Sequence, residues 1–243
     1  MASTAGIITP EWELPAGVQA RLTTRAGGIS QAPYDGFNLA THVGDNRTSV
    51  LANRRSLLRQ LVGVRSVQWL TQVHSNWVVQ AYGGAVVPVA DASSTEQSRL
   101  ACAVLTADCL PVLFCRDDGR QVAAAHAGWR GLADGILLHT LKQFPDPKRV
   151  LVYLAPCIGP SAFEVGPEVK AAFGWASSDC FIAGAGDRWL GNLQRLAAEQ
   201  LLAAGVRSIS ANTDCTVMNS ERYFSYRRDG DSGRQASLIW IES

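Results

Sequence analysis

Three residues of this chain, His74, Cys109 and His126, carry side chains suited to metal binding or nucleophilic catalysis. They lie in three short segments, 71–74 (TQVH), 106–109 (TADC) and 126–131 (HAGWRG). Two imidazoles and one thiolate form a ligand set that suits zinc, and three protein ligands leave a fourth coordination position for water or substrate. The same residues could instead form a cysteine nucleophile activated by a histidine, which needs no metal. Both interpretations place the active site at these three segments.

Four arginines are candidates for binding phosphate or carboxylate, because a guanidinium group offers a planar fork of donors. They are Arg25, Arg130, Arg227 and Arg228. Arg25 and Arg130 are the first choices, since neighbouring glycines leave room for a ligand. The segment 223–230 (YFSYRRDG) joins aromatic to paired basic residues, so it could stack a planar base beside an anion. An edge strand followed by a turn explains that segment equally well.

Two acids, Asp91 and Asp108, could orient an imidazole or accept a proton near such a site. Asp108 directly precedes Cys109. Lone acids in loops also serve as helix caps and turn formers. The remaining histidines, His42 and His139, lack a comparable context, and His139 is most simply a residue on a helix surface.

The sequence predicts strands and helices whose ends carry these residues. Apolar and alternating runs predict strands at 18–24, 67–70, 77–81, 100–105, 111–115, 121–125, 149–154 and 207–210. Helical spacing predicts helices from a cap at Asp45 to about Leu61, and over 132–144, 167–173 and 189–204. Arg25, Cys109 and His126 then follow strands, and His74 lies in or beside a turn. The mixed order argues against a doubly wound sheet or a barrel.

The composition predicts one α/β domain over residues 1–243. Hydrophobic residues make up 47% of the chain, which is enough for a large core. The 22 basic and 21 acidic residues, without long runs, give no general field for nucleic acid or an anionic membrane. The first residues do not resemble a signal peptide, and no apolar segment could span a bilayer, so we expect a cytoplasmic protein. The six cysteines form no C-x-x-C pair and should be reduced, with Cys102 and Cys115 in the core.

Six segments occur in the order typical of one protein family. They are 72–74 (QVH), 90–92 (ADA), 106–112 (TADCLPV), 126–131 (HAGWRG), 163–166 (FEVG) and 224–230 (FSYRRDG). On these motifs, which span nearly everything from Arg25 onward, the chain resembles the YfiH-type laccase-domain proteins, generally described as purine nucleoside phosphorylases. The resemblance implies a layered α/β/β/α fold of the α+β class with mixed sheets, similar to the catalytic domain of cytotoxic necrotizing factors. It also implies that His74, Cys109 and His126 bind zinc.

Activities attributed to this family are phosphorolysis of adenosine, inosine and methylthioadenosine, and deamination of adenosine. We therefore expect a small nucleoside and phosphate as partners, and no nucleic acid, membrane or obligate protein partner. The expected catalytic residues are His74, Cys109, His126 and Asp108. The expected substrate- and phosphate-binding residues are Arg25, Arg130, Arg228 and Asp91.

Other functions stay open at this point. Some family members are described as peptidoglycan editing factors, so a metal-activated water could hydrolyse the amide of a UDP-muramyl-serine substrate. A metal-free cysteine hydrolase would need a Cys109 thiol of low pKa. Copper-dependent polyphenol oxidation is a weaker alternative, because a multicopper laccase needs roughly ten histidines and this chain has four. Copper could still occupy the site and support a side activity, since it outcompetes zinc for most nitrogen and sulfur ligands.

Two positions depart from the usual family pattern. Ser75 follows His74 where the family usually has glycine, and Ser93 and Ser94 replace an apolar pair after the segment 90–92. Neither change removes a proposed ligand, so we expect them to alter the pocket wall and the substrate preference.

Overall fold

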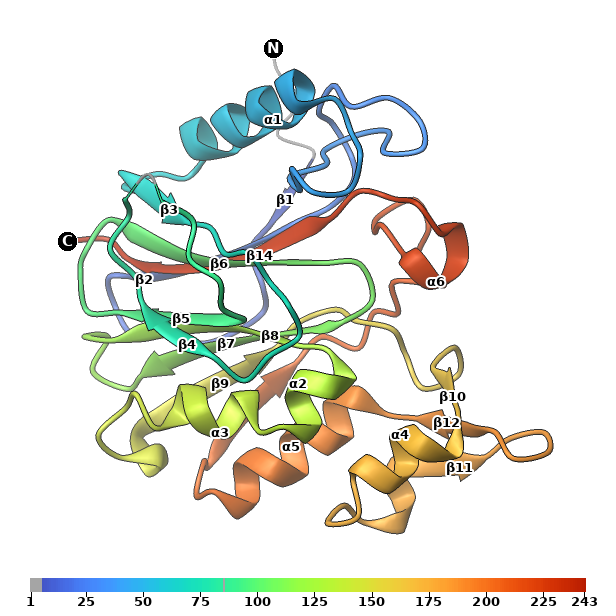
Figure 1. Ribbon diagram of the computed structural model, residues 1–243. Helices are drawn as coiled ribbons and strands as arrows, with labels where there is room; N and C mark the ends of the chain where they lie inside the picture. The colour runs from blue at the N-terminus through green and yellow to red at the C-terminus, as the bar shows by residue number, and fades with distance from the viewer. Residues whose placement is uncertain (1–5, 85) are drawn as a thin grey trace.

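Two mixed β-sheets lie face to face at the centre of the molecule, with helices on both outer sides (Figure 1). The computed structural model describes residues 6–84 and 86–243. The first sheet contains, in spatial order, β1 (Ile7–Ile8), β2 (Val18–Thr23), β14 (Gln235–Ile241), β6 (Leu100–Thr106) and β3 (Ser66–Gln68). The second contains β13 (Ser208–Ala211), β9 (Val150–Leu154), β7 (Leu110–Arg116), β8 (Val122–Ala127), β5 (Ala92–Thr95) and β4 (Val78–Gln80). This confirms the predicted layered α+β fold, while the likeness to cytotoxic necrotizing factors stays a prediction.

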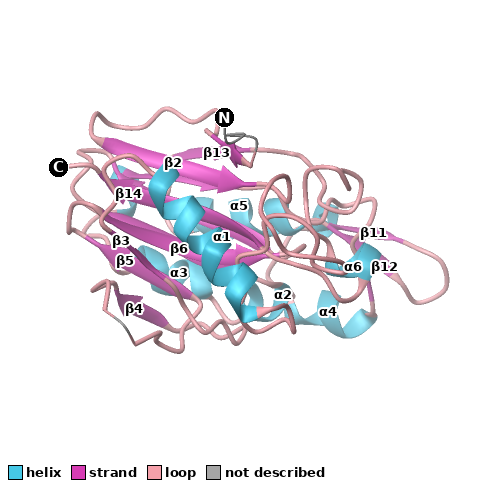
Figure 2. Cartoon of the chain, turned by 90° about the horizontal axis from the view of Figure 1, so that it is seen from above, coloured by secondary structure: helices cyan, strands magenta, loops and turns pink. Residues whose placement is uncertain are grey.

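Helices cover the outer face of each sheet. The first sheet is covered by α1 (Arg47–Gln60), which Figure 2 shows lying across its strands. The second is covered by α2 (Trp129–Ala133), α3 (Ile136–Leu141) and α5 (Leu193–Ala203). A smaller sheet of β10 (Glu164–Val165), β12 (Trp189–Gly191) and β11 (Phe181–Ala183) lies with α4 (Pro167–Ala172) beyond the end of α5, and α6 (Tyr226–Asp229) lies above it (Figure 1). Among the described residues, no helix has the length and apolar character needed to cross a membrane.

The central strands are buried on both faces. Successive residues of a strand point to opposite sides, so Leu100, Cys102 and Val104 of β6 pack between the sheets while the intervening residues pack under α1. In β7, Leu113 and Cys115 also lie between the sheets. A strand covered on both sides is a continuous apolar run, which is why the sequence predicts these strands correctly. The core positions predicted for Cys102 and Cys115 are confirmed.

Three predicted helices begin or end differently in the structure. Asn46, not Asp45, caps α1, because its side-chain oxygen accepts hydrogen bonds from the backbone N–H groups of Thr48 and Ser49. The predicted helix 132–144 starts earlier and divides into α2 and α3 at Gly135, whose φ of 85° interrupts the helix. In the predicted helix 189–204, the first residues instead form β12, and α5 begins only after Asn192.

Two strands that shape the centre were not predicted. β14 lies between β2 and β6 in the first sheet, and it is antiparallel to both. β5 consists of small and polar residues (ASST) with weak strand signals, yet all four are buried against β8. Tertiary pairing thus decides the structure of both segments.

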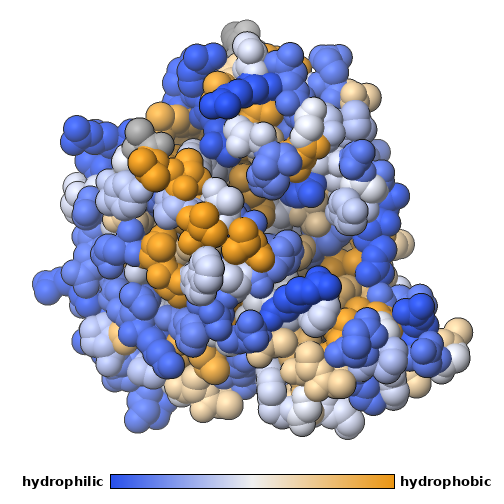
Figure 3. All heavy atoms as spheres, in the orientation of Figure 1, coloured by the Kyte–Doolittle hydropathy of each residue, from blue (hydrophilic) through white to orange (hydrophobic). Residues whose placement is uncertain are grey.

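A group of hydrophobic side chains lies on the surface left of centre in Figure 3. The exposed residues between β3 and β5 include Val73, Val86, Val87 and Val89. This apolar surface therefore belongs to the same segment of chain that carries His74.

Candidate metal centre and substrate pocket

The structure brings His74, Cys109 and His126 together. Their ligating atoms all lie within 4.8 Å of one another, and Cys109 Sγ is 3.8 Å from His74 Nε2. Two ligands of one tetrahedral zinc ion, each bound at its usual distance, lie about 3.5 Å apart. Among residues 6–84 and 86–243, no other group of three such side chains is close enough to hold a metal ion. The donor set and its spacing therefore fit a single zinc ion.

Strand ends and loops of unusual backbone geometry position the three side chains. His126 lies near the end of β8, opposite Pro111 at the start of β7. Cys109 lies in the turn between β6 and β7, where Asp108 has a φ of 96°. His74 lies in the loop between β3 and β4 with a φ of 60°. Left-handed backbone is costly for residues with a Cβ atom, so the surrounding contacts must hold these two loops in place.

Asp91 supplies many of those contacts. Its fully buried carboxylate accepts hydrogen bonds from the backbone N–H groups of Val73, His74 and Ser75, and one more from the Ser75 hydroxyl. Its Oδ1 also lies 2.8 Å from Nδ1 of His126. Burial alone would raise the pKa of Asp91, but the hydrogen bonds from His126 and Ser75 outweigh it and lower the pKa to about 2.

These contacts correct the predicted substrate-binding role of Asp91. The carboxylate lies behind the cluster, does not line the cavity, and fixes which nitrogen His126 turns toward Cys109. Ser75, the residue that departs from the family pattern, adds a hydroxyl donor to the same carboxylate. Asp91 is thus a positioning residue for both histidines.

Gly128 explains why the segment after His126 contains a glycine. A Cβ atom at this position would lie 2.7 Å from Cδ2 of His74 and 3.0 Å from Sγ of Cys109. Such distances are shorter than van der Waals contact. The absence of a side chain therefore lets the backbone between β8 and α2 pack directly against two of the three residues of the cluster.

Cys109 and His126 change each other's pKa. Burial alone would raise the pKa of the Cys109 thiol, but His126 and His74 outweigh it and lower the pKa to about 6. Burial alone would lower the pKa of His126, but the Cys109 thiolate and the Asp91 carboxylate raise it to about 9. Without a metal, the pair is therefore a thiolate and an imidazolium at neutral pH. A thiolate is also the form in which cysteine ligates zinc.

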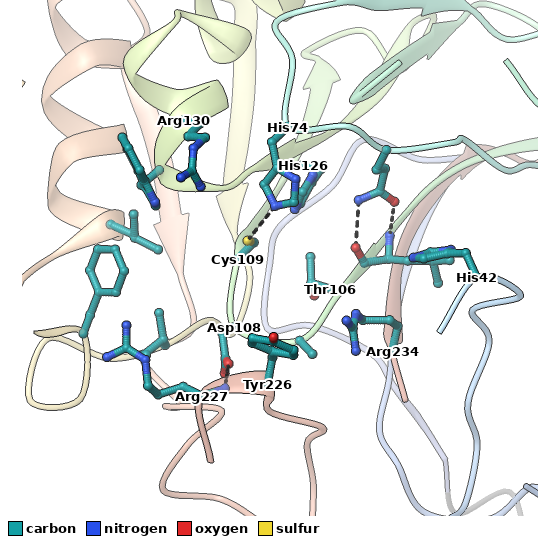
Figure 4. Close-up of a pocket in the computed structure, with 17 residues that line it drawn as sticks. His42, His74, Thr106, Asp108, Cys109, His126, Arg130, Tyr226, Arg227 and Arg234 are labelled. Carbon is teal, nitrogen blue, oxygen red and sulfur yellow. Dashed lines mark hydrogen bonds between the residues drawn. The ribbon is translucent and has the colours of Figure 1, made fainter. Parts of the chain in front are cut away.

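A cavity of about 540 Å³ opens beside the cluster (Figure 4). Its lining includes His42, Gln72, Thr106, Asp108, Tyr226, and the apolar residues Leu105, Ala107, Trp129, Ile158, Phe163 and Leu193. Three arginines also line it, Arg130, Arg227 and Arg234. Figure 4 shows Arg130 and Arg227 on one side of Cys109, and Arg234 and His42 on the other.

Asp108, one of the expected catalytic residues, lines the cavity, and its neighbours hold it in place. Its Oδ1 accepts a hydrogen bond of 2.6 Å from the Thr216 hydroxyl, and its Oδ2 accepts one of 2.7 Å from the backbone N–H of Arg227. Arg227 in turn donates to the carbonyls of Ala162 and Glu164, on either side of Phe163. The predicted segment 223–230 therefore reaches the site, but it contains the short helix α6 rather than an edge strand.

Two of the predicted anion-binding arginines lie outside the cavity. Arg25 follows β2 as expected, but its guanidinium lies 3.2 Å from Asp35 and 3.9 Å from Asp229. Arg228 lies 2.7 Å from Asp229 and donates to backbone carbonyls. Neither side chain lines the cavity beside the cluster, and both guanidinium groups contact acids and carbonyls of their own surroundings. Of the four candidate arginines, Arg130 and Arg227 line the cavity.

Two cavity residues, His42 and Arg234, were not predicted. Partial burial, followed by the charges of Arg234 and Arg54, lowers the pKa of His42. Arg234 directly precedes β14, whose first residue Gln235 is the partner of Thr106 on β6. The adjacent Gly233 is the one local signal for Arg234 in the sequence. The position of Arg234 depends on β14, a strand that was not predicted.

Comparison with known proteins identifies the family. The sequence model of the family described as multi-copper polyphenol oxidoreductase laccase matches residues 19–242. The chain belongs to this laccase family. The protein named purine nucleoside phosphorylase YfiH of Escherichia coli (strain K12) is 45% identical over 240 residues, which cover 97% of this chain and 98% of that protein.

Solved structures of laccase-family relatives share the fold. A crystal structure of the Neisseria meningitidis protein NMB0706 has 45% sequence identity and a TM-score of 0.94, covering 98% of this chain and all of that one. YlmD from Geobacillus stearothermophilus has 29% identity and a TM-score of 0.93, covering 100% of this chain and 98% of that one. The family description names several coppers, whereas the described residues of this laccase-family chain bring together a single three-ligand cluster.

Proposed function

We propose that this protein is a zinc-dependent purine nucleoside phosphorylase that also deaminates adenosine. The observation that carries the proposal is the position of the His74–Cys109–His126 cluster in the wall of a cavity with an apolar side and three arginines. The cavity volume of about 540 Å³ suits a small organic ligand. The names of relatives such as the Escherichia coli protein support the choice of a purine nucleoside.

Phosphorolysis requires one bond to form as another breaks. A phosphate oxygen bonds to the anomeric carbon of ribose while the bond from that carbon to the purine nitrogen breaks. The purine leaves with the electron pair and takes up a proton. Because positive charge develops on the sugar, a nearby anion stabilises the transition state. Asp108, held by Thr216 and Arg227, is the carboxylate that lines the cavity.

The apolar side of the cavity suits the purine base. Phe163, Ile158 and Leu193 belong to one hydrophobic cluster of buried residues, and Trp129 packs against it. Flat apolar surfaces bind a purine by stacking and burial. A base held there leaves the ribose toward Asp108 and Cys109, where the bond between ribose and purine is cleaved.

Deamination of adenosine needs an activated water rather than phosphate. Zinc held by His74, Cys109 and His126 would supply Lewis acidity and lower the pKa of a water at the open coordination position. Asp108 would take up a proton from the attacking water and pass it to the amino group, which then leaves as ammonia, when the amino carbon of the purine rather than the ribose lies beside the cluster. In this proposal Cys109 is a ligand rather than a nucleophile.

The decisive experiment uses metal-analysed protein and adenosine, with and without phosphate, with chromatography of the products. We expect one zinc per chain, adenine and ribose 1-phosphate only when phosphate is present, and inosine in both cases. The variant His74→Ala should lose zinc and both reactions, whereas His139→Ala, a histidine outside the cavity, should retain them. Phosphorolysis that persists in His74→Ala after deamination is lost would contradict a shared site.

The same experiment separates the other candidate functions. A protein that binds zinc but does not convert adenosine should be tested for release of serine from UDP-muramyl-serine, which indicates an amidase of the peptidoglycan editing type. Activity that survives complete chelation would indicate a cysteine hydrolase. Oxidation of polyphenols only after loading with copper would indicate the side activity suggested by the family description.

A further inference from the structure

The end of the cavity opposite its apolar wall contains a cation that the reaction above leaves unassigned. We propose that Arg234 and His42 form the phosphate-binding subsite of this protein. The inference rests on the proposed phosphorylase function and places phosphate at the start of β14, away from the arginines on the other side of Cys109. Inorganic phosphate is the ligand, and its oxygens accept the hydrogen bonds.

Arg234 keeps part of its guanidinium free for a ligand, as does Arg130, whose side chain makes no hydrogen bond or ion pair in the described part of the chain. Nη1 of Arg234 donates to the backbone carbonyls of Ser232 and Gly233, while no hydrogen bond from its Nε or Nη2 is found within residues 6–84 and 86–243. No carboxylate lies within ion-pair distance of it in that part of the chain. By contrast, Arg227 uses both Nη1 and Nη2 on the carbonyls of Ala162 and Glu164. A guanidinium with a free edge can bind two phosphate oxygens at once.

Arg234 is also held more firmly than Arg130. Its backbone N–H donates to the Asn38 side chain, its carbonyl accepts from the N–H of Leu39, and its side chain is half-buried. Arg130 is exposed, and its guanidinium stacks 4.4 Å from the ring centre of Trp129 on the apolar side. A fixed, half-buried donor loses less side-chain entropy on binding and is less screened by water. Phosphate should therefore prefer Arg234.

Two neighbours complete a polar surface around Arg234. His42 lines the same end of the cavity and offers a ring N–H donor (Figure 4). Thr106 also lines the cavity, and its buried hydroxyl has no hydrogen-bond partner among the described residues. Buried hydroxyl groups are usually paired, so an unpaired one beside a cation points to a ligand or water that completes it. These three residues come from β6, from the start of β14 and from the loop before α1.

The two ends of the cavity then fix the direction of the nucleoside. With the base against Phe163 and Leu193 and the phosphate at Arg234, the ribose lies between them, beside Cys109 and Asp108. Figure 4 shows Asp108 and Cys109 between Arg227 and Arg234. Phosphate and base thus lie on opposite sides of the sugar, which is the geometry that a direct displacement at the anomeric carbon requires.

The test measures binding of inorganic phosphate to the zinc-loaded protein by calorimetry, and the KM for phosphate in adenosine phosphorolysis. Removing a charge-assisted contact in Arg234→Ala should weaken phosphate binding about 10- to 100-fold. Arg234→Lys, which keeps the charge but not the fork, should restore part of the affinity. Arg25→Ala removes an arginine outside the cavity and should bind phosphate like the wild type.

Each outcome addresses one proposal. Weaker phosphate binding in Arg234→Ala supports the subsite even if adenosine is not cleaved, a result that would contradict only the phosphorylase function. Normal phosphate binding and KM in Arg234→Ala would overturn the subsite and leave the phosphorylase function intact. A loss confined to Arg130→Ala would place phosphate on the opposite side. Unchanged thermal unfolding and zinc content of Arg234→Ala would show that the variant is folded.

Discussion

Cys109, just before β7, and Cys115, within β7, have thiols whose pKa values shift in opposite directions. Cys115 lies inside the core between the sheets, where burial, followed by the negative charges of Asp118 and Asp117, raises the pKa of its thiol to about 12. Cys109 lies just before the same strand, and the histidines beside it lower its thiol pKa to about 6. Burial disfavours the thiolate at both positions. Two imidazoles beside Cys109, rather than exposure to water, lower the pKa of its thiol, whereas Cys115 has no imidazole beside it and stays protonated.

Replacing each cysteine with alanine should give the largest contrast. Cys109→Ala removes one of three metal ligands, so we expect loss of bound zinc and a fall in phosphorolysis and deamination of at least about 1,000-fold. Cys115→Ala only removes a buried sulfur, so activity should stay within about twofold while stability falls by about 1 to 2 kcal/mol. Zinc analysis, product chromatography and thermal unfolding measure these effects. Full activity in zinc-free Cys109→Ala would contradict the proposed centre.

A smaller loss is expected when the ligands remain but their support is removed. Asp91→Asn keeps the size of the side chain but weakens the acceptor that orients His126 and holds the His74 loop. Outer-sphere partners of this type contribute about 10- to 100-fold to metal affinity. Competition with a zinc chelator measures the affinity, and Asp134→Asn, which changes an exposed acid in the turn between α2 and α3, is the control. Equal zinc affinity in both variants would show that Asp91 does not position the ligands.

The pH dependence of alkylation compares the two thiols within one molecule. In metal-free protein, the Cys109 thiolate disappears as the pH falls through about 6, so its alkylation should be about tenfold faster at pH 7 than at pH 5. Cys115 should not react in the folded protein over this range. Mass spectrometry of peptides after brief treatment with iodoacetamide separates the two sites. Added zinc should protect Cys109, and a midpoint near pH 8.5, typical of an unperturbed thiol, would refute the thiolate–imidazolium pair.

The sequence allowed the His74–Cys109–His126 cluster and the central strands to be predicted because their signals are local. His74, Cys109 and His126 stand beside small or polar residues, and strands buried on both faces are continuous apolar runs. Gly128 is a further local signal, because the turn packs so closely against His74 and Cys109 that a side chain does not fit there.

The candidate anion-binding residues were harder to predict, because tertiary structure decides which arginines already form ion pairs with acids. Arg25 and Arg228 have glycine neighbours in the sequence, yet acids that are distant or adjacent in the chain neutralise them. Arg234 reaches the cavity only because β14 pairs with β6 at one register. A sequence shows which residues can bind an anion, but not which of them already have a partner.

The smallest effect should come from adding one methyl group beside the cluster. In Gly128→Ala the new Cβ atom would press on the His74 ring and the Cys109 sulfur. The crowded atoms belong to side chains, and that of His74 is exposed, so we expect a loss of about 1 kcal/mol in stability, at the low end for overpacking, and weaker zinc binding. Gly174→Ala is the matched control, because its nearest neighbour, the Ala171 carbonyl oxygen, is 3.7 Å away. Calorimetric unfolding with and without zinc distinguishes the two variants. If Gly128→Ala binds zinc as tightly as Gly174→Ala, the ligands move freely and are not held in place by the backbone between β8 and α2.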